Sequence, residues 1–471
     1  MQSAIFVMKN DITAIFAFLR YFLSYKENMS RIIDGINWQH LYSFAFKQAL
    51  LGLCFDGIES LGKEYPEELK KNPIERDLLM AWMGAAQQIH RQNMKVNAVA
   101  GKLYSMLRED GLRCCILKGQ GNALMYPNAY SRNPGDIDVW VNASREQITE
   151  YAKKHFKLGD DIRYQHIETS VDGVPVELHF FPCTMNNPIY NARLQKWFKR
   201  NADLQCSNVV SLPDGIGKIA IPTTAFNVIY QLTHLYHHFF DEGIGMRQII
   251  DYFLVVNDFS KNVFLNNDLS NPSVNFSNHP VPLSKEGSTA FPKPLSPQGT
   301  GDVTAPSRCS EPLRSKDGGP SKVSPDCAGW DRRDAIGDIA FNASGSSSFT
   351  TNSSASTALD VVQRELKYLG LWKFAGAVMY VLHEALGLSE EKMIAPMDEK
   401  RGRLLLAEIL DGGNFGRHFT KYAGFTHQSM GKKYFLKIWR NMHFVRYYPA
   451  EALCEPLFRT WHFFWRLKYK K

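Results

Sequence analysis

The chain lacks the cysteine patterns of a zinc ribbon and of a disulfide-stapled secreted domain. Its 471 residues contain eight cysteines, but no CxxC pair occurs, and Cys114 and Cys115 are neighbours inside an apolar run. Because neither metal-ligand spacing nor a disulfide framework is present, a reducing cytoplasm is the expected location.

A long hydrophobic run is also missing. The amino-terminal stretch Ala4–Ser24 is apolar but is interrupted by Lys9, Asp11 and Arg20. Its longest uninterrupted part, residues 12–19, is far shorter than the roughly 20 residues that a membrane span needs. No small-residue cleavage site follows a basic start. We therefore expect a buried or docking helix here and no transmembrane segment.

Positive charge exceeds negative charge only mildly. The formal net charge is +8 over the whole chain, which suits anionic small molecules, nucleic acid or an anionic membrane surface and selects none of them. No repeat of solenoid length is visible. No Ser-His-Asp or Cys-His arrangement is supported by spacing alone. Hydrophobic residues make up 44% of the chain, which is enough to build a sizeable core.

The hydrophobic periodicity divides the chain into helical and mixed parts. Apolar residues repeat at helical spacing from Trp38 to Glu109, and residues 87–107 read as one long helix. Near Gly111 the pattern changes from helical periodicity to short apolar runs separated by polar turns. Helical periodicity returns over residues 222–259 and again from Leu359 nearly to the end of the sequence.

The middle of the chain reads as a compact α/β unit. Ile137, Val139 and Val141 alternate with polar neighbours, as in a strand. Ser144, with Gln147 three residues on, forms a capping-box pattern that opens a helix through residue 154. Two further strands, 163–171 and 174–180, are joined at Asp172-Gly173, which is a strong hairpin signal.

The expected fold class is α+β, with a small mixed sheet embedded in largely helical regions. The segments are an N-terminal helical region (1–110), an α/β core (111–215), a helical segment (216–259), an insertion rich in Ser, Pro and Asn (260–357) and a C-terminal helical region (358–471). The insertion has too few apolar residues to offset its ordering entropy, so we expect it to be disordered.

Three carboxylates are the candidate chemical groups. Asp136 and Asp138 project to the same side of one predicted strand, because side chains alternate along a strand. Two carboxylates this close repel unless a cation lies between them, and Mg²⁺ prefers such hard oxygen ligands. Glu177 on a later strand is the candidate third carboxylate, able to bind metal and to polarise an acceptor hydroxyl as general base.

A phosphate-binding turn is expected just upstream. Lys118-Gly119-Gln120 lies at a predicted strand-to-helix turn, where free backbone N–H groups favour phosphate. Gly119 permits close approach of the backbone, and Lys118 and Arg132 are both candidates to hold a triphosphate.

Together these segments resemble the polymerase-beta-like nucleotidyltransferase superfamily. The sequence is most similar to its uncharacterised bacterial nucleotidyltransferase family, in which Leu-Lys-Gly precedes Arg-x-x-x-Asp-Ile-Asp. The likeness continues through Glu177-Leu178-His179, through residues 243–251 and through residues 413–416. One departure is Gly119-Gln120, where the superfamily usually has Gly-Ser, so a serine contact with phosphate must be lost or replaced.

The resemblance implies transfer of a nucleoside monophosphate from an NTP to a hydroxyl acceptor, with release of pyrophosphate. Asp136, Asp138 and Glu177 would hold Mg²⁺ or Mn²⁺, and Lys118, Gly119, Gln120 and Arg132 would bind the nucleotide. Two alternatives stay open: a non-catalytic nucleotide-binding or antitoxin-like module, and a peripheral protein that binds RNA or a membrane surface. Nucleic acid is a possible but not a favoured partner.

Several other patterns allow a plain structural interpretation. His234, His237 and His238 fall on one predicted helix, and histidines near the cleft are favoured over a zinc site because no HExxH arrangement accompanies them. Arg247 and Asp251 are spaced i,i+4, so an ion pair on the helix is favoured over a nucleotide or acceptor contact.

Two carboxy-terminal patterns also allow a plain structural interpretation. Residues 412–416 are glycine-rich, and a helix C-cap and turn is preferred there to a loop lining the acceptor pocket. The basic and aromatic tail 432–471 is read as a packed amphipathic helix pair in preference to an RNA or membrane patch.

Overall fold

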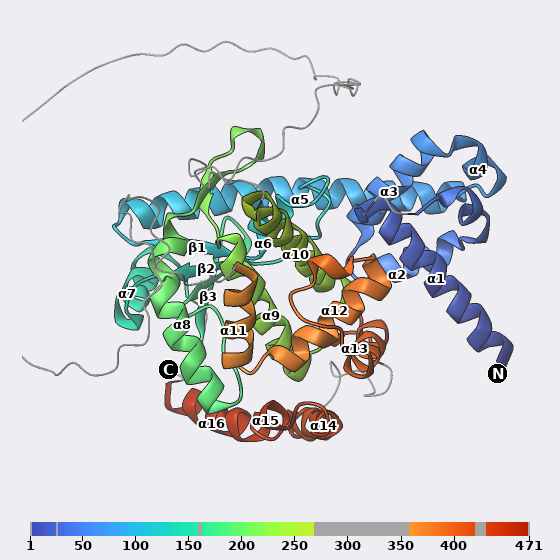
Figure 1. Ribbon diagram of the computed structural model, residues 1–471. Helices are drawn as coiled ribbons and strands as arrows, with labels where there is room; N and C mark the ends of the chain where they lie inside the picture. Colours follow the sequence, from blue (N-terminus) through green and yellow to red (C-terminus); the bar gives the residue numbers. More distant parts are fainter. Residues whose placement is uncertain (1, 25–26, 159–162, 268–357, 420–429, 470–471) are drawn as a thin grey trace, which may run out of the picture. The chain divides into compact units, whose positions relative to one another are not determined.

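A four-stranded sheet lies beside α7 and α8 (Figure 1). Its spatial order is β1 (Cys114–Leu117), β2 (Ile137–Val141), β4 (Val174–His179) and β3 (His166–Val171). Strand β2 runs parallel to β4, whereas β1 and β3 are antiparallel to their neighbours. The sheet is thus mixed, and the expected α+β class is confirmed.

The computed structural model describes the chain in five stretches: 2–24, 27–158, 163–267, 358–419 and 430–469. These residues belong to one structural unit, formed by the chain up to Ser273 and from Ser353 onward. The disorder expected for 260–357 falls almost wholly outside the described residues. Its first part, up to Asn267, belongs to a helix.

Helices make up most of the remaining structure. The α-helices are α1 (Gln2–Ser24), α2 (Trp38–Lys47), α3 (Leu51–Glu64), α4 (Pro66–Lys71), α5 (Arg76–Glu109), α6 (Gly119–Ala123), α7 (Arg145–His155), α8 (Pro188–Ser207), α9 (Thr224–Asp241), α10 (Met246–Asn267), α11 (Ala358–Tyr368), α12 (Trp372–Leu386), α13 (Glu399–Gly412), α14 (Met430–Met442), α15 (Pro449–Ala452) and α16 (Glu455–Tyr469). Short 3-10 turns are η1 (Met29–Arg31), η2 (Ile33–Gly35), η3 (Pro213–Gly215), η4 (Glu390–Lys392) and η5 (Asn414–Gly416).

The local signals in the core are confirmed. Strands β3 and β4 form the expected hairpin, and both turn residues, Asp172 and Gly173, have positive φ (50° and 74°), which Gly and Asp tolerate best. Helix α7 opens with the capping box: Ser144 accepts from the N–H of Gln147, and the Gln147 side chain accepts from the N–H of Ser144.

Three expectations need correction. The long helix α5 begins at Arg76, well before residue 87, and it contacts both α3 and β1 (Figure 1). The helical stretch over 222–259 is two helices, because the chain breaks at Gly243, whose φ of +107° no other residue adopts easily. A second sheet of β5 (Val209–Ser211) and β6 (Lys218–Ala220) was not expected, since three-residue strands carry little periodic signal.

The four-stranded sheet is buried on both faces. Ile137, Val139 and Val141 point to one side, where they pack with α5 and α7. On the opposite side Trp140 stacks with Phe226 of α9 at 5.9 Å between ring centroids. The polar side chains that share the Trp140 face therefore lie at the boundary between the sheet and the helical segments.

The amino-terminal stretch is the expected docking helix. Phe18 and Leu19 of α1 are fully buried, and α1 packs on α12 and α3. Among the described residues, no helix combines the length and apolar character that crossing a membrane requires.

The carboxy-terminal helices are tied to the rest of the fold through Glu451. This buried carboxylate accepts from the backbone N–H groups of Asn186, just before α8, and Asn187 (Oε2, 3.2 Å). Burial raises the pKa of Glu451 to about 7, although the two N–H groups oppose this. At a pH between the ordinary pKa of a glutamate and about 7, Glu451 is protonated in the folded state but ionised in the unfolded chain.

A pH dependence of stability follows. The contribution of Glu451 to the free energy of unfolding is fully present below the ordinary pKa of a glutamate. It is lost as the pH rises through about 7, and the loss amounts to roughly 3 kcal/mol. Urea unfolding of the wild type and of Glu451→Gln, compared between pH 5 and pH 8, should show a difference in free energy of unfolding that shifts in favour of the variant at pH 8. A difference independent of pH would contradict the assignment.

Candidate active site

Strand parity and register bring the candidate carboxylates together. Asp138 on β2 and Glu177 on β4 are direct partners in the parallel pair. Asp136 precedes Asp138 by two residues and so lies on the same side. One carboxylate oxygen from each of Asp136, Asp138 and Glu177 lies within 4.8 Å of the other two. The structure thus places these three acids as a group.

Asp138 is the buried member of the group, with 6% of its surface exposed. Its Oδ2 lies 3.1 Å from the Lys118 ammonium, and its Oδ1 lies 2.9 Å from His179 Nε2. Burial raises the pKa of Asp138, but Lys118 and His179 outweigh it and hold the pKa well below its ordinary value. Asp138 is therefore ionised over the whole physiological range.

Asp136 is the exposed member. The negative charge of Asp138, followed by burial, raises the pKa of Asp136 to about 6, and Lys118 only partly offsets this. In the described part of the chain no basic side chain forms an ion pair with it. Asp136 is thus a repelled carboxylate at the rim of the group.

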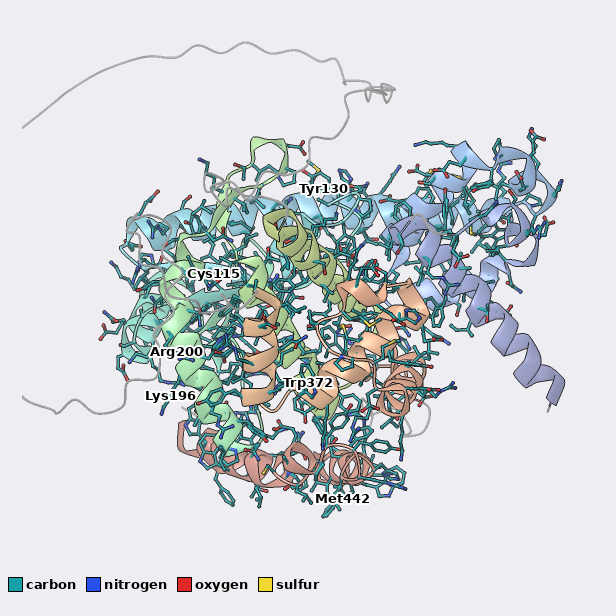
Figure 2. All side chains as sticks on the ribbon, viewed as in Figure 1. Cys115, Tyr130, Lys196, Arg200, Trp372 and Met442 are labelled. Carbon is teal, nitrogen blue, oxygen red and sulfur yellow. The ribbon has the colours of Figure 1, made fainter. Side chains whose placement is uncertain are left out.

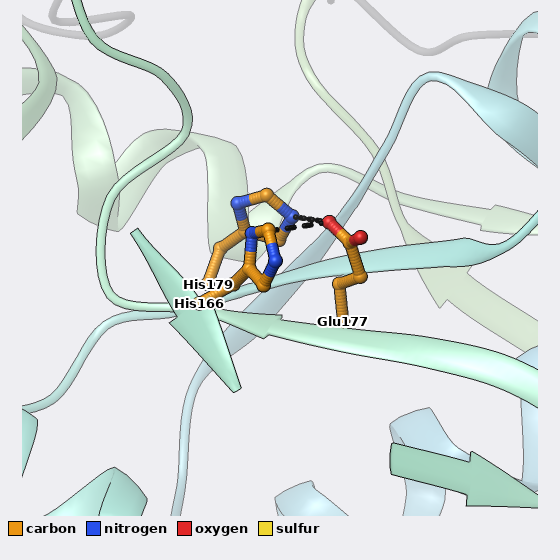
Figure 3. Close-up of side chains that lie close together, drawn as sticks. All are labelled: His166, Glu177 and His179. Atoms are coloured by element: carbon orange, nitrogen blue, oxygen red, sulfur yellow. Dashed lines mark hydrogen bonds and ion pairs between the residues drawn. The ribbon is translucent and has the colours of Figure 1, made fainter. Parts of the chain in front are cut away.

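Glu177 and two histidines form a second contact set, which Figure 3 shows with both imidazoles reaching toward the same carboxylate. His179 Nε2 lies 3.1 Å and His166 Nδ1 3.2 Å from Glu177 Oε2. Burial lowers the pKa of His179, but Asp138 and Glu177 raise it to about 9 overall. Burial lowers the pKa of His166 to about 4. His166 is consequently neutral at physiological pH.

Lys118 occupies a strained backbone position. Its φ of 52° and ψ of −128° belong to a region that glycine adopts easily and other residues rarely adopt. Such a conformation costs on the order of 1–3 kcal/mol and persists where the surroundings hold it. Here the ammonium lies between Asp138 and the neutral His234, whose Nε2 is 2.7 Å away.

The turn after Lys118 differs in part from expectation. Gly119 has a φ of +37° and lines the pocket described below. The Gln120 side chain is instead buried and donates to Asn97 of α5, so it does not reach the pocket. Helix α6 has only five residues and contributes little dipole. Any phosphate contact at this turn must come from the backbone and from Lys118.

Arg132 lies in the pocket wall and is buried. It binds Asp251 of α10 with both ends of its fork, at 2.8 Å (Nε to Oδ1) and 2.7 Å (Nη2 to Oδ2). The Asp251 carboxylate also accepts from Tyr126 at 2.8 Å. The predicted helix ion pair of Arg247 with Asp251 is therefore wrong: within the described stretches Asp251 pairs with Arg132, a residue 119 positions away.

Arg247 is left as a buried cation without a carboxylate partner among the described side chains. Only 8% of its surface is exposed, and its Nε makes no hydrogen bond. Its Nη1 donates to the carbonyl of Asn133 at 3.1 Å, and its guanidinium lies 5.5 Å from the Phe415 ring. Burial, followed by the charge of Arg132, lowers its pKa. The site thus presents a guanidinium suited to an anionic ligand.

These groups line one pocket. Its lining comes from the turn after β1 (Lys118, Gly119), from the approach to β2 and β2 itself (Arg132, Gly135, Asp136, Asp138), from α9 (Gln231, His234, Leu235), from α10 (Arg247, Gln248, Asp251) and from η5 (Phe415). Residues 412–416 thus form the expected cap of α13 and, through Phe415, also line the pocket.

His238 Nδ1 lies 3.7 Å from Glu242 Oε2, but the three helix histidines form no metal-compatible group among the described residues. His234 and His238 face each other at 3.0 Å between their Nε2 atoms. Burial lowers the pKa of both, to about 3 for His238. In the described part of the chain the metal-compatible groups are the two that share Glu177, so the preferred interpretation of these histidines as residues near the cleft agrees with the structure.

The donor set fits a hard divalent cation. Three carboxylates converge, and the charge of Asp138 keeps the pKa of Asp136 high. An ion between the acids would relieve this repulsion, and carboxylate oxygens are ligands that Mg²⁺ accepts together with water and phosphate. The residues therefore suit the ion that the sequence led us to expect.

An α+β core with a strand-borne group of acids, beside a pocket that also contains lysine and arginine, defines a nucleotidyltransferase-like architecture. Residues 34–270 match the protein family described as "Uncharacterised nucleotidyltransferase", and the chain belongs to this family.

Other comparisons add little. A solved structure, an antigenic nucleotidyltransferase-like protein from Paracoccidioides brasiliensis, is 16% identical in sequence. The alignment covers 34% of this chain and 75% of that protein's chain, with a TM-score of 0.24. A likeness at that score carries no weight. The comparison with curated proteins finds no match.

Sequence reasoning missed His166 and the pocket residues Gln231 and Gln248. A signal for His166 existed: a two-residue turn at Asp172-Gly173 fixes the hairpin register, which places His166 opposite His179. No comparable local signal points to Gln231 or Gln248, because their approach depends on how α9 and α10 pack.

Proposed function

We propose that the chain is a metal-dependent nucleotidyltransferase that moves a nucleoside monophosphate from an NTP to a hydroxyl acceptor. The observation that carries this proposal is the convergence of Asp136, Asp138 and Glu177 beside a pocket that contains Lys118 and Arg247. Family membership supports the reaction class. The proposal includes a polymerase-beta-like origin of the core, a bacterial source and a cytoplasmic location, the last supported by six described cysteines that are free thiols.

Asp136, Asp138 and Glu177 would hold Mg²⁺ or Mn²⁺, which when bound would neutralise triphosphate charge and stabilise the charge that develops on the transferred phosphoryl group. The side chains around them bind and orient the substrate. Lys118 and Arg247 supply positive charge to the phosphates. Arg132 contributes its charge, because Asp251 occupies its Nε and Nη2 and its Nη1 donates to the carbonyl of Asn133 at 3.4 Å. Gly119 lets the backbone approach.

The transfer itself needs one proton acceptor. The acceptor oxygen attacks the α-phosphorus, its proton passes to the Glu177 carboxylate, and the bond from the α-phosphorus to the bridging oxygen breaks to release pyrophosphate. Burial raises the pKa of Glu177, but the hydrogen bond from His179 and the charge of His179 together outweigh it and lower the pKa, so the carboxylate is ionised. Glu177 is thus proposed as both metal ligand and base.

The test uses the purified full chain with α-labelled ATP, GTP, CTP and UTP, with Mg²⁺ or Mn²⁺, and with pools of sugars, proteins and RNA as acceptors. Metal-dependent labelling of one pool together with pyrophosphate release supports the proposal. Saturable nucleotide binding without either product would instead establish a non-catalytic nucleotide-binding module.

Arg247 offers a separate test of the pocket. Replacing it with Gln should raise the KM for the triphosphate by roughly 10- to 100-fold with a small change in kcat, because a charge-assisted hydrogen bond contributes about 1.5–3 kcal/mol. Arg247→Lys should recover part of the affinity, since a point charge lacks the guanidinium fork. Arg113→Gln, which removes an exposed arginine paired with Asp203, is the matched control. An unchanged KM in Arg247→Gln would exclude this residue from substrate binding.

A specific observation favours a second role for the carboxy-terminal helices. Helix α14 exposes Phe435, Trp439 and Met442 at i, i+4 and i+7 spacing, and α16 exposes Leu457, Trp461 and Phe464 at the same spacing. The two helices touch through Tyr434 and Thr460. Figure 2 labels Met442, half exposed at the end of α14. These stripes are too large to be scattered surface residues.

Charge in the same region selects the partner. Residues 430–471 contain ten Lys and Arg against two Glu, a net +8 that equals the net charge of the whole chain. Both of those Glu, 451 and 455, are buried, but so is Arg440, and Lys437 and Arg459 pair with Asp241, so not all ten basic charges face solvent. Apolar stripes with basic residues suit an anionic phospholipid surface, so we propose that this region docks there.

Vesicle sedimentation of the full chain tests this docking. Vesicles containing phosphatidylglycerol should bind it and pure phosphatidylcholine vesicles should not, and the double variant Trp439→Glu/Leu457→Glu should lose at least tenfold in partitioning. Phe46→Glu, at an equally exposed position of α2, is the control. Retention on RNA with no vesicle binding would overturn the membrane assignment.

A further inference from the structure

The contact set of His166, Glu177 and His179 has the composition of a metal site of a different kind from the carboxylate group. One ligand atom from each residue lies within 4.8 Å of the other two. Two of the three ligands are imidazole nitrogens, which suit Zn²⁺ and similar transition metals and not Mg²⁺. Glu177 belongs to this group and also to the carboxylate group.

The distances are close to those of a tetrahedral ion. His179 Nε2 is 3.1 Å and His166 Nδ1 is 3.2 Å from Glu177 Oε2. A tetrahedral metal with bonds of about 2.0–2.1 Å separates its ligands by roughly 3.3 Å. The three residues can therefore accept such an ion with small side-chain adjustments, once His179 Nε2 releases the proton that it shares with Asp138 at 2.9 Å.

The surroundings of His166 supply a second, independent observation. Both of its ring nitrogens are buried, and neither makes a hydrogen bond within the described structure. Its contacts with Glu177 and Glu168 lack hydrogen-bond geometry, and a ligand could complete a buried imidazole of this kind. Its Nδ1 points toward Glu177, as Figure 3 shows.

The outer contact of His166 has the arrangement found around bound metals. Glu168 Oε1 lies 3.6 Å from His166 Nε2, the nitrogen that faces away from Glu177. Metal-ligating histidines are usually oriented by a polar group on the far nitrogen.

Register explains why these residues meet. His166 is opposite His179 and Glu168 is opposite Glu177 in the β3–β4 hairpin. All four side chains thus project from one face of two neighbouring strands. A hairpin is a rigid platform for such a site.

We propose that His166, Glu177 and His179 bind a zinc-class divalent ion, with its fourth position open to water or substrate. This site shares Glu177 with the Mg²⁺ group but does not depend on the transfer reaction. The ion would hold Glu177 in place from the β3 side.

Cobalt is the probe, because Co²⁺ with nitrogen ligands in a tetrahedral site absorbs strongly in the visible range, whereas Co²⁺ with oxygen ligands in an octahedral site absorbs weakly. The full chain is stripped with a chelator and titrated with Co²⁺. One equivalent should give an intense visible band, and Zn²⁺ should displace it. A weak band, or no saturation, would overturn the proposal.

Variants separate this site from the carboxylate group. His166→Gln should weaken Co²⁺ binding by at least about tenfold. His166→Cys should retain binding and add a sulfur-to-cobalt band in the near ultraviolet, which loss of folding would not produce. His90→Gln, an exposed histidine of α5, is the control.

Asp136→Asn distinguishes the two sites. It should leave the cobalt band unchanged while it abolishes Mg²⁺-dependent transfer, because Asp136 belongs only to the carboxylate group. Equal Co²⁺ affinity in the wild type and in His166→Gln would refute the histidine site without bearing on the transferase proposal. A cobalt band lost in Asp136→Asn would also refute it, since the ion would then lie among the acids.

Discussion

Asp136→Asn is expected to lower nucleotidyl transfer by about a thousandfold or more while leaving the protein as stable as the wild type or slightly more stable. The activity is lost because the proposed metal loses one of its three carboxylates. Stability is kept because Asp136 is exposed and is repelled by Asp138, which raises its pKa to about 6. A carboxylate with a raised pKa destabilises the fold once the pH exceeds that value, so its removal is favourable at pH 7 to 8. Rates of pyrophosphate release and urea unfolding curves measure the two effects.

Asp172→Asn is the matched control for this variant. Asp172 lies in the β3–β4 turn and pairs with Lys102 on the surface, and asparagine tolerates its positive φ. It should retain full activity. The proposal for Asp136 fails if Asp136→Asn keeps more than about a tenth of the wild-type rate, or if its activity falls only together with its folded fraction.

The second large effect concerns the buried pair of Arg132 and Asp251. Asp251→Asn should reduce the free energy of unfolding by about 3–5 kcal/mol, because it leaves a buried guanidinium without its counter-charge. The side chains are only 4% and 6% exposed, and the pair joins the loop before β2 to α10 across the wall of the pocket. Denaturant titration at constant pH measures the loss.

The surface pair of Arg113 and Asp203 gives the comparison. Its side chains are 48% and 71% exposed, so Asp203→Asn should change the free energy of unfolding by no more than about 1 kcal/mol. The double variant Arg132→Met/Asp251→Leu should recover much of the loss seen in Asp251→Asn, because two apolar side chains replace a buried charge pair. A loss below about 1 kcal/mol in Asp251→Asn would mean that water reaches Arg132 in solution.

The carboxylate group could be predicted because it depends on local rules. Alternation along β2 fixes the common side of Asp136 and Asp138, and alternation along β4 fixes the side of Glu177. The Asp172-Gly173 turn identifies the hairpin. The roles of these residues in catalysis and in metal binding remain predictions until the experiments above are done.

Long-range pairing could not be predicted in the same way. The helix spacing of Arg247 and Asp251 suggested a local pair, whereas Asp251 binds Arg132 through packing of α10 against the loop before β2. Gln120 follows the turn glycine, yet its side chain turns toward α5 because Asn97 satisfies its amide there. In both cases the deciding contact is with an element distant in sequence, and no periodic pattern encodes it.

The conformation of Lys118 has a consequence for engineering this protein. Glycine at position 118 would accept the positive φ with no side-chain clash, but it would also leave the buried Asp138 without the ammonium that offsets its charge. Such a variant would lose the ammonium that faces Asp138 and His234. The lost ion pair outweighs the relieved backbone strain, so glycine is not expected among heat-resistant clones, and position 118 is best held fixed in any stabilised library.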